Sequence, residues 1–387
     1  MTLLKTISLL RACFLFLIAL SCSKTSAQAP SSVDQELLSI IEEARDYSLV
    51  KPAHSLALLE SNQALVANAS EYNRFIYYRT GFWVSVHLYD VNRISYYAHA
   101  MLQNRRFSGS KRHFHEVLNS MSLWFRVNQN YSASIAAGRC AIKFSESEVD
   151  ANRNSVSPAL TLLLQDQYLE AQRIFEMNVL MNEKSENKIG LAAAKNNLGL
   201  LHVFNGNYID ADANFRAALK LNEEMARATG TALNLANLLL VFYLQQDWDN
   251  FYRLSARANR ASKTLENEDL KQYILWINSA FKIKTQGNKA NYKNALIASY
   301  NQVKEPTVLK IMALLAQNLE ITLPQTTQLT TAKSIDFLQV FPVCQSASKS
   351  TIQISKLLTT KMSKHLSVTQ LAEKADAGDA GTPTKIQ

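Results

Sequence analysis

Short polar turns that end in an aromatic residue recur along this chain at a nearly constant interval. They end at Tyr131, Tyr168, Tyr208, Trp248 and Tyr292, and successive ends lie 37, 40, 40 and 44 residues apart. The segment Leu88–Val91 continues the series, 40 residues before Tyr131. A fixed period in this range is typical of a solenoid, in which each helix pair has an apolar face that only its neighbours cover. We therefore expect function to lie on a long curved surface and not in a catalytic pocket.

The clearest unit runs from Lys195 to Asn222 and indicates how each helix pair would pack. Gly199 in the first expected helix and Ala211 in the second are small, as a close crossing of two helices requires. Phe215 follows Ala211 by four residues, so both fall on one helical face and the ring fills the space beside the crossing. Gly206 lies in the turn, where glycine permits a positive φ.

Together with Leu198, Tyr208 and Ala218, these positions resemble a tetratricopeptide repeat. The period is longer than the usual 34 residues of that family. With Asn-Asn-Leu-Gly at Asn196–Gly199, it looks like the longer-helix variety. The resemblance implies an all-α protein, a right-handed α-solenoid of antiparallel helix pairs, with about six to seven units over residues 30–320. Composition agrees, because only 10 of 387 residues are glycine, and a sheet protein of this length would need more turn glycines.

The neighbouring units keep the pattern less fully. The preceding unit retains Tyr168, Ala171 and Phe175 at the same offsets. The following unit has Phe251 where a small residue is expected and Ser255 where a large one is expected. This exchange of bulk still allows the pair to fill its volume.

Residues 1–27 are predicted to be an export signal, with Lys5 and Arg11 ahead of a short apolar run, Ala12–Leu20. Two cleavage hypotheses stay open. Ile18–Cys22 resembles a bacterial lipoprotein box, in which Cys22 would receive the lipid, and an ordinary signal peptidase could instead cut after Ala27. Either hypothesis predicts a protein of the periplasm or, with the lipid anchor, an outer-membrane lipoprotein.

The C-terminal part has a different character. Residues 321–349 are expected to be an irregular, Thr- and Gln-rich linker, and residues 375–387 a disordered tail. Between them, residues 350–374 have apolar residues at intervals of four, namely Ile354, Leu358, Met362 and Leu366. This pattern predicts an amphipathic helix, and we expect it to cap the open end of the solenoid.

Charge and cysteine content restrict the classes of partner. The formal net charge is +9, and the loss of residues 1–27 would remove three positive and no negative charges and leave +6. For an exported chain this modest excess argues against nucleic acid as the partner. Cys140 and Cys344 would remain in the exported chain. They could pair in an oxidising compartment, but two buried free thiols are the more usual outcome.

The sequence contains no recognisable catalytic motif, so we predict a non-enzyme without cofactor or metal. The 10 glycines form no phosphate-binding loop, and there is no C-x-x-C, H-E-x-x-H or G-x-S-x-G. His113 and His115 are the one close histidine pair, and on a helix residues i and i+2 point apart.

Candidate partner-binding residues follow from the resemblance, which implies that the first helix of each pair lines a concave groove. They are Asn196, Asn197 and Phe204 in one unit and Asn237 and Tyr243 in the next. Asparagine can donate to and accept from a peptide backbone, so a ladder of asparagines suits an extended segment. The alternative is that these asparagines bond neighbouring helices inside the stack.

Our main hypothesis is a non-catalytic scaffold or adaptor of the bacterial cell envelope, which binds a peptide segment or a partner helix in the concave groove. The alternative is an extracytoplasmic sensory module. The layout is similar to the periplasmic repeat half of membrane-bound diguanylate cyclases or histidine kinases, but no output motif follows the repeats here.

Overall fold

The computed structural model describes residues 31–324 except 49, 89, 105–110, 264 and 288, together with residue 344 and residues 353–362. The expected signal at residues 1–27 with Cys22, most of the linker and the expected tail lie outside these residues. All regular secondary structure in the described ranges is helical. The helices are α2 (Ser32–Tyr47), α3 (Pro52–Ser61), α4 (Gln63–Val66), α5 (Glu71–His87), α6 (Val91–Gln103), α8 (Lys111–Val127), α9 (Tyr131–Phe144), α10 (Glu148–Leu164), α11 (Tyr168–Lys184), α12 (Lys188–Phe204), α13 (Tyr208–Glu224), α14 (Ala228–Gln245), α15 (Trp248–Lys263), α16 (Glu268–Gln286), α17 (Lys289–Tyr300), α18 (Pro306–Asn318) and α21 (Ile354–Met362).

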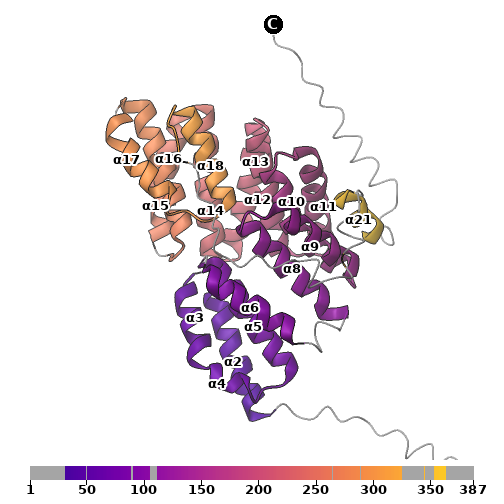
Figure 1. Cartoon of the computed structure of the whole chain (residues 1–387). Helices are drawn as coiled ribbons and strands as arrows, with labels where there is room; N and C mark the ends of the chain where they lie inside the picture. Colours follow the sequence, from indigo (N-terminus) through magenta and orange to yellow (C-terminus); the bar gives the residue numbers. More distant parts are fainter. Residues whose placement is uncertain are drawn as a thin grey trace, which may run out of the picture.

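Consecutive helices form antiparallel pairs that stack on one another, as Figure 1 shows for α10 to α17. This confirms the predicted α-solenoid. Val91, Tyr131, Tyr168, Tyr208 and Trp248 are each the first residue of the second helix of a pair, so the turn period located the helix starts. Tyr292 differs from these residues. The polar turn expected to end there ends earlier, because α17 begins at Lys289.

The turns repeat in conformation as well as in spacing. The residue in the left-handed region, with φ between 58° and 75°, occupies an equivalent place in successive turns: Gln129, Asp166, Gly206, Gln246 and Gly287. Asparagine precedes several helices as the N-cap residue. Its side-chain oxygen accepts a hydrogen bond from the backbone N–H three residues later, which has no partner within the helix. This cap occurs at Asn130, Asn187 and Asn207.

The packing expected inside the clearest unit is confirmed. A Cβ atom added at Gly199 would lie 2.6 Å from the Phe215 ring, so α12 and α13 cross where no side chain fits. Ala211 and Phe215 are fully buried on the facing side of α13. In the next unit, Phe251 is buried and stacks on Phe281 with 4.3 Å between ring centroids. Two stacked aromatic rings therefore fill the volume in that unit, where the large and small residues are exchanged.

Helix α18 does not simply extend the stack. It packs on α16 and also on α10, which begins the fourth helix pair before it in the chain. Arg126 of α8 pairs with Glu305 at 2.6 Å, and Lys310 of α18 pairs with Asp166 at 2.6 Å. At another point the backbone N–H of Glu266 donates to the carbonyl of Val50. The last contact joins the segment after α2 to the segment after α15, and the N-terminal helices α2–α6 lie below the later units in Figure 1.

The C-terminal helix lies elsewhere than expected. Its described part, α21, packs against α9, α10 and α11 in the middle of the solenoid and not on the last helices. Ile354 and Leu358 are buried there, and Ser355 donates to Glu170 through both its backbone N–H, at 2.8 Å, and its hydroxyl, at 2.9 Å. Three helices in the middle of the stack thus cover the apolar face of α21, which an amphipathic helix buries against its neighbours.

Cys140 and Cys344 form a disulfide, with Cα atoms 5.6 Å apart and a separation of 204 positions in sequence. The expectation of two free thiols was therefore wrong. The bond attaches the segment before α21 to α9, and both cysteines are fully buried. Sequence could not give this pairing, because it depends on the chain folding back over its own middle.

One helix in the described part of the chain, α14, is long and apolar enough to cross a membrane by length and composition alone. About 61% of that stretch is buried inside the fold, including Leu235 to Tyr243. Its apolar character serves the core, where it packs between α12, α13, α15 and α16.

Candidate functional site

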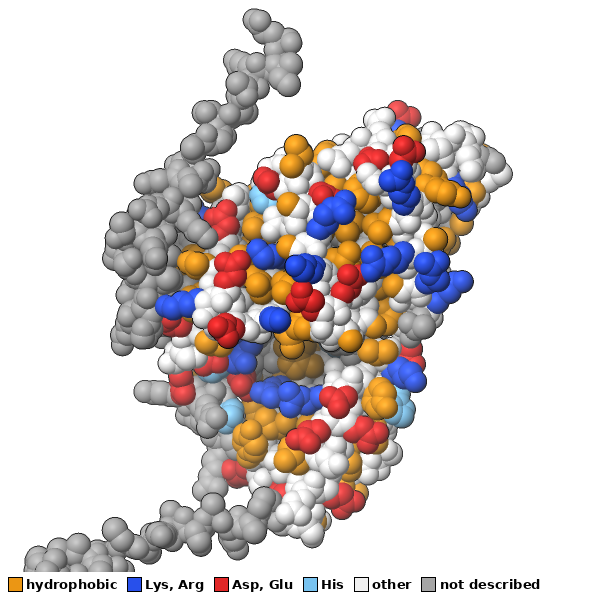
Figure 2. Space-filling view, turned by 180° about the vertical axis from the view of Figure 1, so that it is seen from behind, with side chains coloured by type: hydrophobic (Ala, Val, Ile, Leu, Met, Phe, Trp, Pro, Cys, Tyr) orange, Lys and Arg blue, Asp and Glu red, His pale blue; other side chains and the backbone are white. Residues whose placement is uncertain are grey.

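A cavity of about 890 Å³ lies between the N-terminal helices and the repeats that follow, and we call it the first lobe. Figure 2 shows the molecule hollowed at this level, with Lys and Arg side chains around the opening. The lining comes almost entirely from first helices of successive pairs, as the resemblance implied. The lining residues used below are Glu42, Arg45 and Asp46 of α2, Arg79, Trp83 and His87 of α5, Glu116 of α8, Arg153 of α10 and Ile189 of α12.

A second cavity of about 550 Å³ adjoins the first and shares Asp46 and His87 with it; we call it the second lobe. It is lined by the N-terminal halves of α12 and α14 and by the turns before them. Its residues include Ala192, Ala193, Asn196, Asn197, Arg227, Thr229, Leu233 and Asn234. Because they share these two residues, the two lobes lie side by side, and we refer to them together as the central channel.

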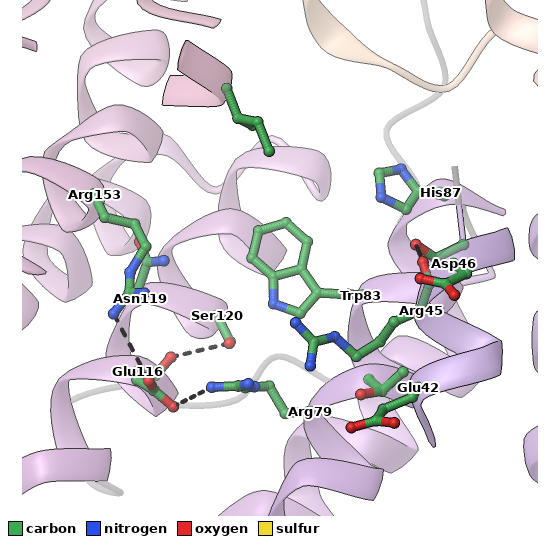
Figure 3. Close-up of a pocket in the computed structure, with 13 residues that line it drawn as sticks. Glu42, Arg45, Asp46, Arg79, Trp83, His87, Glu116, Asn119, Ser120 and Arg153 are labelled. Carbon is green, nitrogen blue, oxygen red and sulfur yellow. Dashed lines mark hydrogen bonds and ion pairs between the residues drawn. The ribbon is translucent and has the colours of Figure 1, made fainter. Parts of the chain in front are cut away.

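Ion pairs organise one wall of the first lobe. Glu116 accepts from Arg79 at 2.6 Å, and its other carboxylate oxygen lies 3.7 Å from Arg153 (Figure 3). Arg153 also pairs with Asp150 at 2.7 Å. Arg45, on the opposite wall, has no carboxylate oxygen within 4 Å among the described residues. Three guanidinium groups and three carboxylates line this lobe, and of these guanidinium groups only that of Arg45 forms no ion pair with a described residue.

His87 marks the junction of the two lobes. Burial lowers its pKa to about 4, while the Glu305 carboxylate acts in the opposite direction. Its ring lies 6.5 Å from that of Trp83. The imidazole is therefore neutral at neutral pH and adds a hydrogen-bonding group without charge to the middle of the channel.

The predicted asparagines form a ladder inside the stack. Asn234 and Asn237 of α14 both donate to the side-chain oxygen of Asn196 in α12, each at 2.8 Å. Asn222 donates to Asn234 at 2.8 Å, and the hydroxyl of Tyr273 donates to Asn237 at 2.9 Å. All five side chains are buried. The alternative given above for Asn196 and Asn237, bonding between neighbouring helices, is what the structure shows.

Helix α18 covers the other end of the expected groove. Tyr243 is 2% exposed, and its hydroxyl donates to Asn318 of α18 at 3.0 Å. Lys310 of α18 lies over the ring of Phe204, 5.3 Å from the centroid. The structure thus removes Asn237 and Tyr243 from the accessible surface. Phe204 stays half-buried beneath Lys310, and Asn197 faces the second lobe.

Arg45, Arg79, His87 and Arg227 line the channel but were not among the predicted residues. They lie in weakly matching units or at turns, where no spacing signal marks them. Trp83 lies in an aromatic-rich stretch of α5, in which Tyr77 and Phe82 are buried. The curvature of the solenoid brings these side chains together, and the sequence of a single repeat does not determine that curvature.

The histidine pair behaves as its spacing indicates. His113 lies against Phe75, with 5.0 Å between ring centroids, and His115 contacts Asn154 at 3.1 Å. Among the described residues, no group of three or more His, Cys, Asp or Glu side chains is arranged to hold a metal ion.

Comparison with known proteins shows the fold. No family model matches the sequence, and no curated protein matches it. Among solved structures, a Rap protein complexed with Competence and Sporulation Factor aligns with a TM-score of 0.61 and 14% identity, over 88% of each chain. The apo form of the quorum sensor NprR from B. thuringiensis aligns with a TM-score of 0.50 and 13% identity, over 88% of this chain and 94% of that one. The chain therefore has a tetratricopeptide-like repeat fold.

Proposed function

We propose that this protein is a non-catalytic scaffold that captures an extended segment of another protein in its central channel. The observation that carries the proposal is the pair of neighbouring lobes, which are lined mainly by first helices of successive units and share Asp46 and His87. An extended segment suits it, because an elongated channel offers contacts along a chain and a preformed wall lowers the ordering cost of binding.

Two further observations support the proposal. The asparagine ladder ties α12, α13, α14 and α16 together through buried hydrogen bonds, which makes the channel wall rigid. Of the two similar structures, one is a Rap protein in complex with a factor and the other is a quorum sensor. This similarity favours ligand capture over a purely architectural role.

We place this activity in the bacterial cell envelope. The apolar segment at residues 12–20 and the disulfide between Cys140 and Cys344 both suit an exported protein, since disulfides persist in oxidising compartments. Metabolic labelling with palmitate, with and without Cys22→Ser, tests the lipid anchor. Label that depends on Cys22 supports the anchor, and no label in the wild type supports cleavage after Ala27.

Site-specific photo-crosslinking tests the channel. A benzophenone amino acid at Asn197, inside the second lobe, should give discrete protein adducts in the producing cells, and the same group at Tyr252 should not. Tyr252 lies on α15 and is 75% exposed. Ala193→Trp, which fills the second lobe, should abolish the adducts, and Ala256→Trp on exposed α15 surface is the matched control. Equal adducts from both positions, or adducts that survive Ala193→Trp, would overturn the proposal.

A further inference from the structure

The side chains that line the first lobe of the central channel indicate the chemistry of the segment that it binds. The geometry points to a captured segment with an acidic residue, whose carboxylate binds between Arg45 and Arg79 while an apolar side chain beside it packs against Trp83 and Ile189. This inference rests on the proposed function and specifies the chemistry of its ligand.

The charge distribution within the lobe supports the acidic residue. Figure 3 shows the side chain of Arg45 reaching from α2 toward Trp83, and that of Arg79 lying on the same side of the indole. The acidic residues Glu42 and Asp46 lie near α2, where Arg45 begins (Figure 3), and no ion pair joins either of them to Arg45. The guanidinium group of Arg45 therefore extends into the lobe without a carboxylate partner among the described residues.

The existing ion pairs involve Arg79 and Arg153 and leave Arg45 without a carboxylate partner among the described residues. Glu116 is the carboxylate that Arg79 contacts, and it is shared with Arg153. Arg153 has Asp150 as a closer partner. Glu116 thus serves Arg79 and Arg153, and Arg45 keeps its donors for a ligand. A ligand carboxylate would complete the pairing, because guanidinium groups bind carboxylates through two parallel hydrogen bonds.

The apolar contact comes from two exposed side chains that line the same cavity. Trp83 of α5 is 37% exposed, and Ile189 of α12 is 54% exposed. They come from helices far apart in sequence, so the fold brings them to one cavity. Exposed aromatic side chains in a recess are frequent anchors of binding energy. A volume of about 890 Å³ accommodates both the acidic and the apolar side chain of one segment.

A peptide selection tests the inference directly. The disulfide-bonded protein is immobilised, and a random library of octapeptides with blocked ends is selected against it and sequenced. Peptides retained by the wild type should be enriched in Asp or Glu next to a large apolar residue. Arg45→Gln should lower the affinity of a resynthesised winning peptide by about tenfold, the usual scale for a charged hydrogen bond. Replacing the acid in that peptide by its amide should have a similar effect.

Charge reversal separates recognition from a general loss of folding. Arg45 is exposed and makes no side-chain hydrogen bond to a described residue, so Arg45→Glu should leave the circular dichroism spectrum unchanged. The selection should then shift from acidic toward basic peptides. Arg257→Glu on the outer helix α15 is the control and should not shift it.

The outcomes are distinct. Retained peptides without acidic enrichment, or an enrichment that survives both Arg45 variants, would refute the acidic specificity and leave the scaffold function standing. No peptide retained above the bare matrix would refute the scaffold function as well.

Discussion

Replacing Asn237 with alanine should destabilise the protein and leave the channel surface intact. Asn237 is fully buried, donates to Asn196 at 2.8 Å and accepts from the hydroxyl of Tyr273 at 2.9 Å. In the variant, Asn196 keeps its second donor, Asn234, but the fully buried Tyr273 hydroxyl loses its acceptor. An orphaned buried polar group costs about 1–3 kcal/mol, and a lost hydrogen bond adds about 1 kcal/mol. We therefore expect the free energy of unfolding to fall by about 2–4 kcal/mol.

A double-mutant cycle identifies the cause. Tyr273→Phe removes the hydroxyl, so Asn237→Ala combined with Tyr273→Phe should be no less stable than Asn237→Ala alone. The coupling energy should exceed about 1 kcal/mol, well above the roughly 0.5 kcal/mol expected for independent sites. Asn197→Ala is the matched control. Its half-buried side chain makes no hydrogen bond to a described residue, and the change should stay within about 0.5 kcal/mol.

Urea unfolding followed by circular dichroism measures all four variants, with the slope of free energy against urea as a check on the unfolded state. Asn237→Ala with wild-type stability would refute the structural role of the ladder. So would equal losses for Asn237→Ala and Asn197→Ala, because the argument depends on the difference in burial between two asparagines of the same register.

Three further predictions concern packing, the disulfide and pH. Gly199→Ala should lower the free energy of unfolding by about 1–3 kcal/mol, because the new methyl group would overlap the Phe215 ring; a change below 0.5 kcal/mol in urea unfolding would contradict the close crossing. Cys140→Ser with Cys344→Ser should lower the urea midpoint markedly, since the chain-entropy model assigns roughly 5 kcal/mol to a loop of this length; an unchanged midpoint would contradict a stabilising bond. His87 has its folded pKa lowered to about 4 from about 6.5 in the unfolded chain, so its neutral form stabilises the fold above pH 6.5, and this stability is lost as the pH falls toward 4. His87→Gln should therefore flatten the loss of stability between pH 6.5 and 4 by about 1–3 kcal/mol, and parallel pH profiles for the variant and the wild type would argue against the lowered pKa.

Local sequence was sufficient for the repeat and for packing inside a unit. The turn period located the starts of α6, α9, α11, α13 and α15, because each turn must reverse the chain with the same few residues in the same conformation. Gly199, Ala211 and Phe215 predicted the close crossing of α12 and α13, since residues three and four apart share a helical face. Both inferences concern neighbours in the chain, where geometry follows directly from spacing.

Contacts between distant units could not be predicted from spacing along the chain. Register alone suggested that Asn237 and Tyr243 would face a partner, whereas the structure buries them against Tyr273 and Asn318. The pairing of Cys140 with Cys344 likewise required the chain to return to its own middle.

The sequence by itself determined an all-helical repeat protein with a defined helix pair of about forty residues. Tertiary structure alone decided that the solenoid curls until α18 reaches α10, and that Arg45, Arg79, Trp83 and Ile189 line one cavity. The physical reason is that small rotations between successive helix pairs add up. Side-chain packing at each interface sets one rotation, and the sum over several pairs determines which distant residues meet. No single repeat encodes that sum.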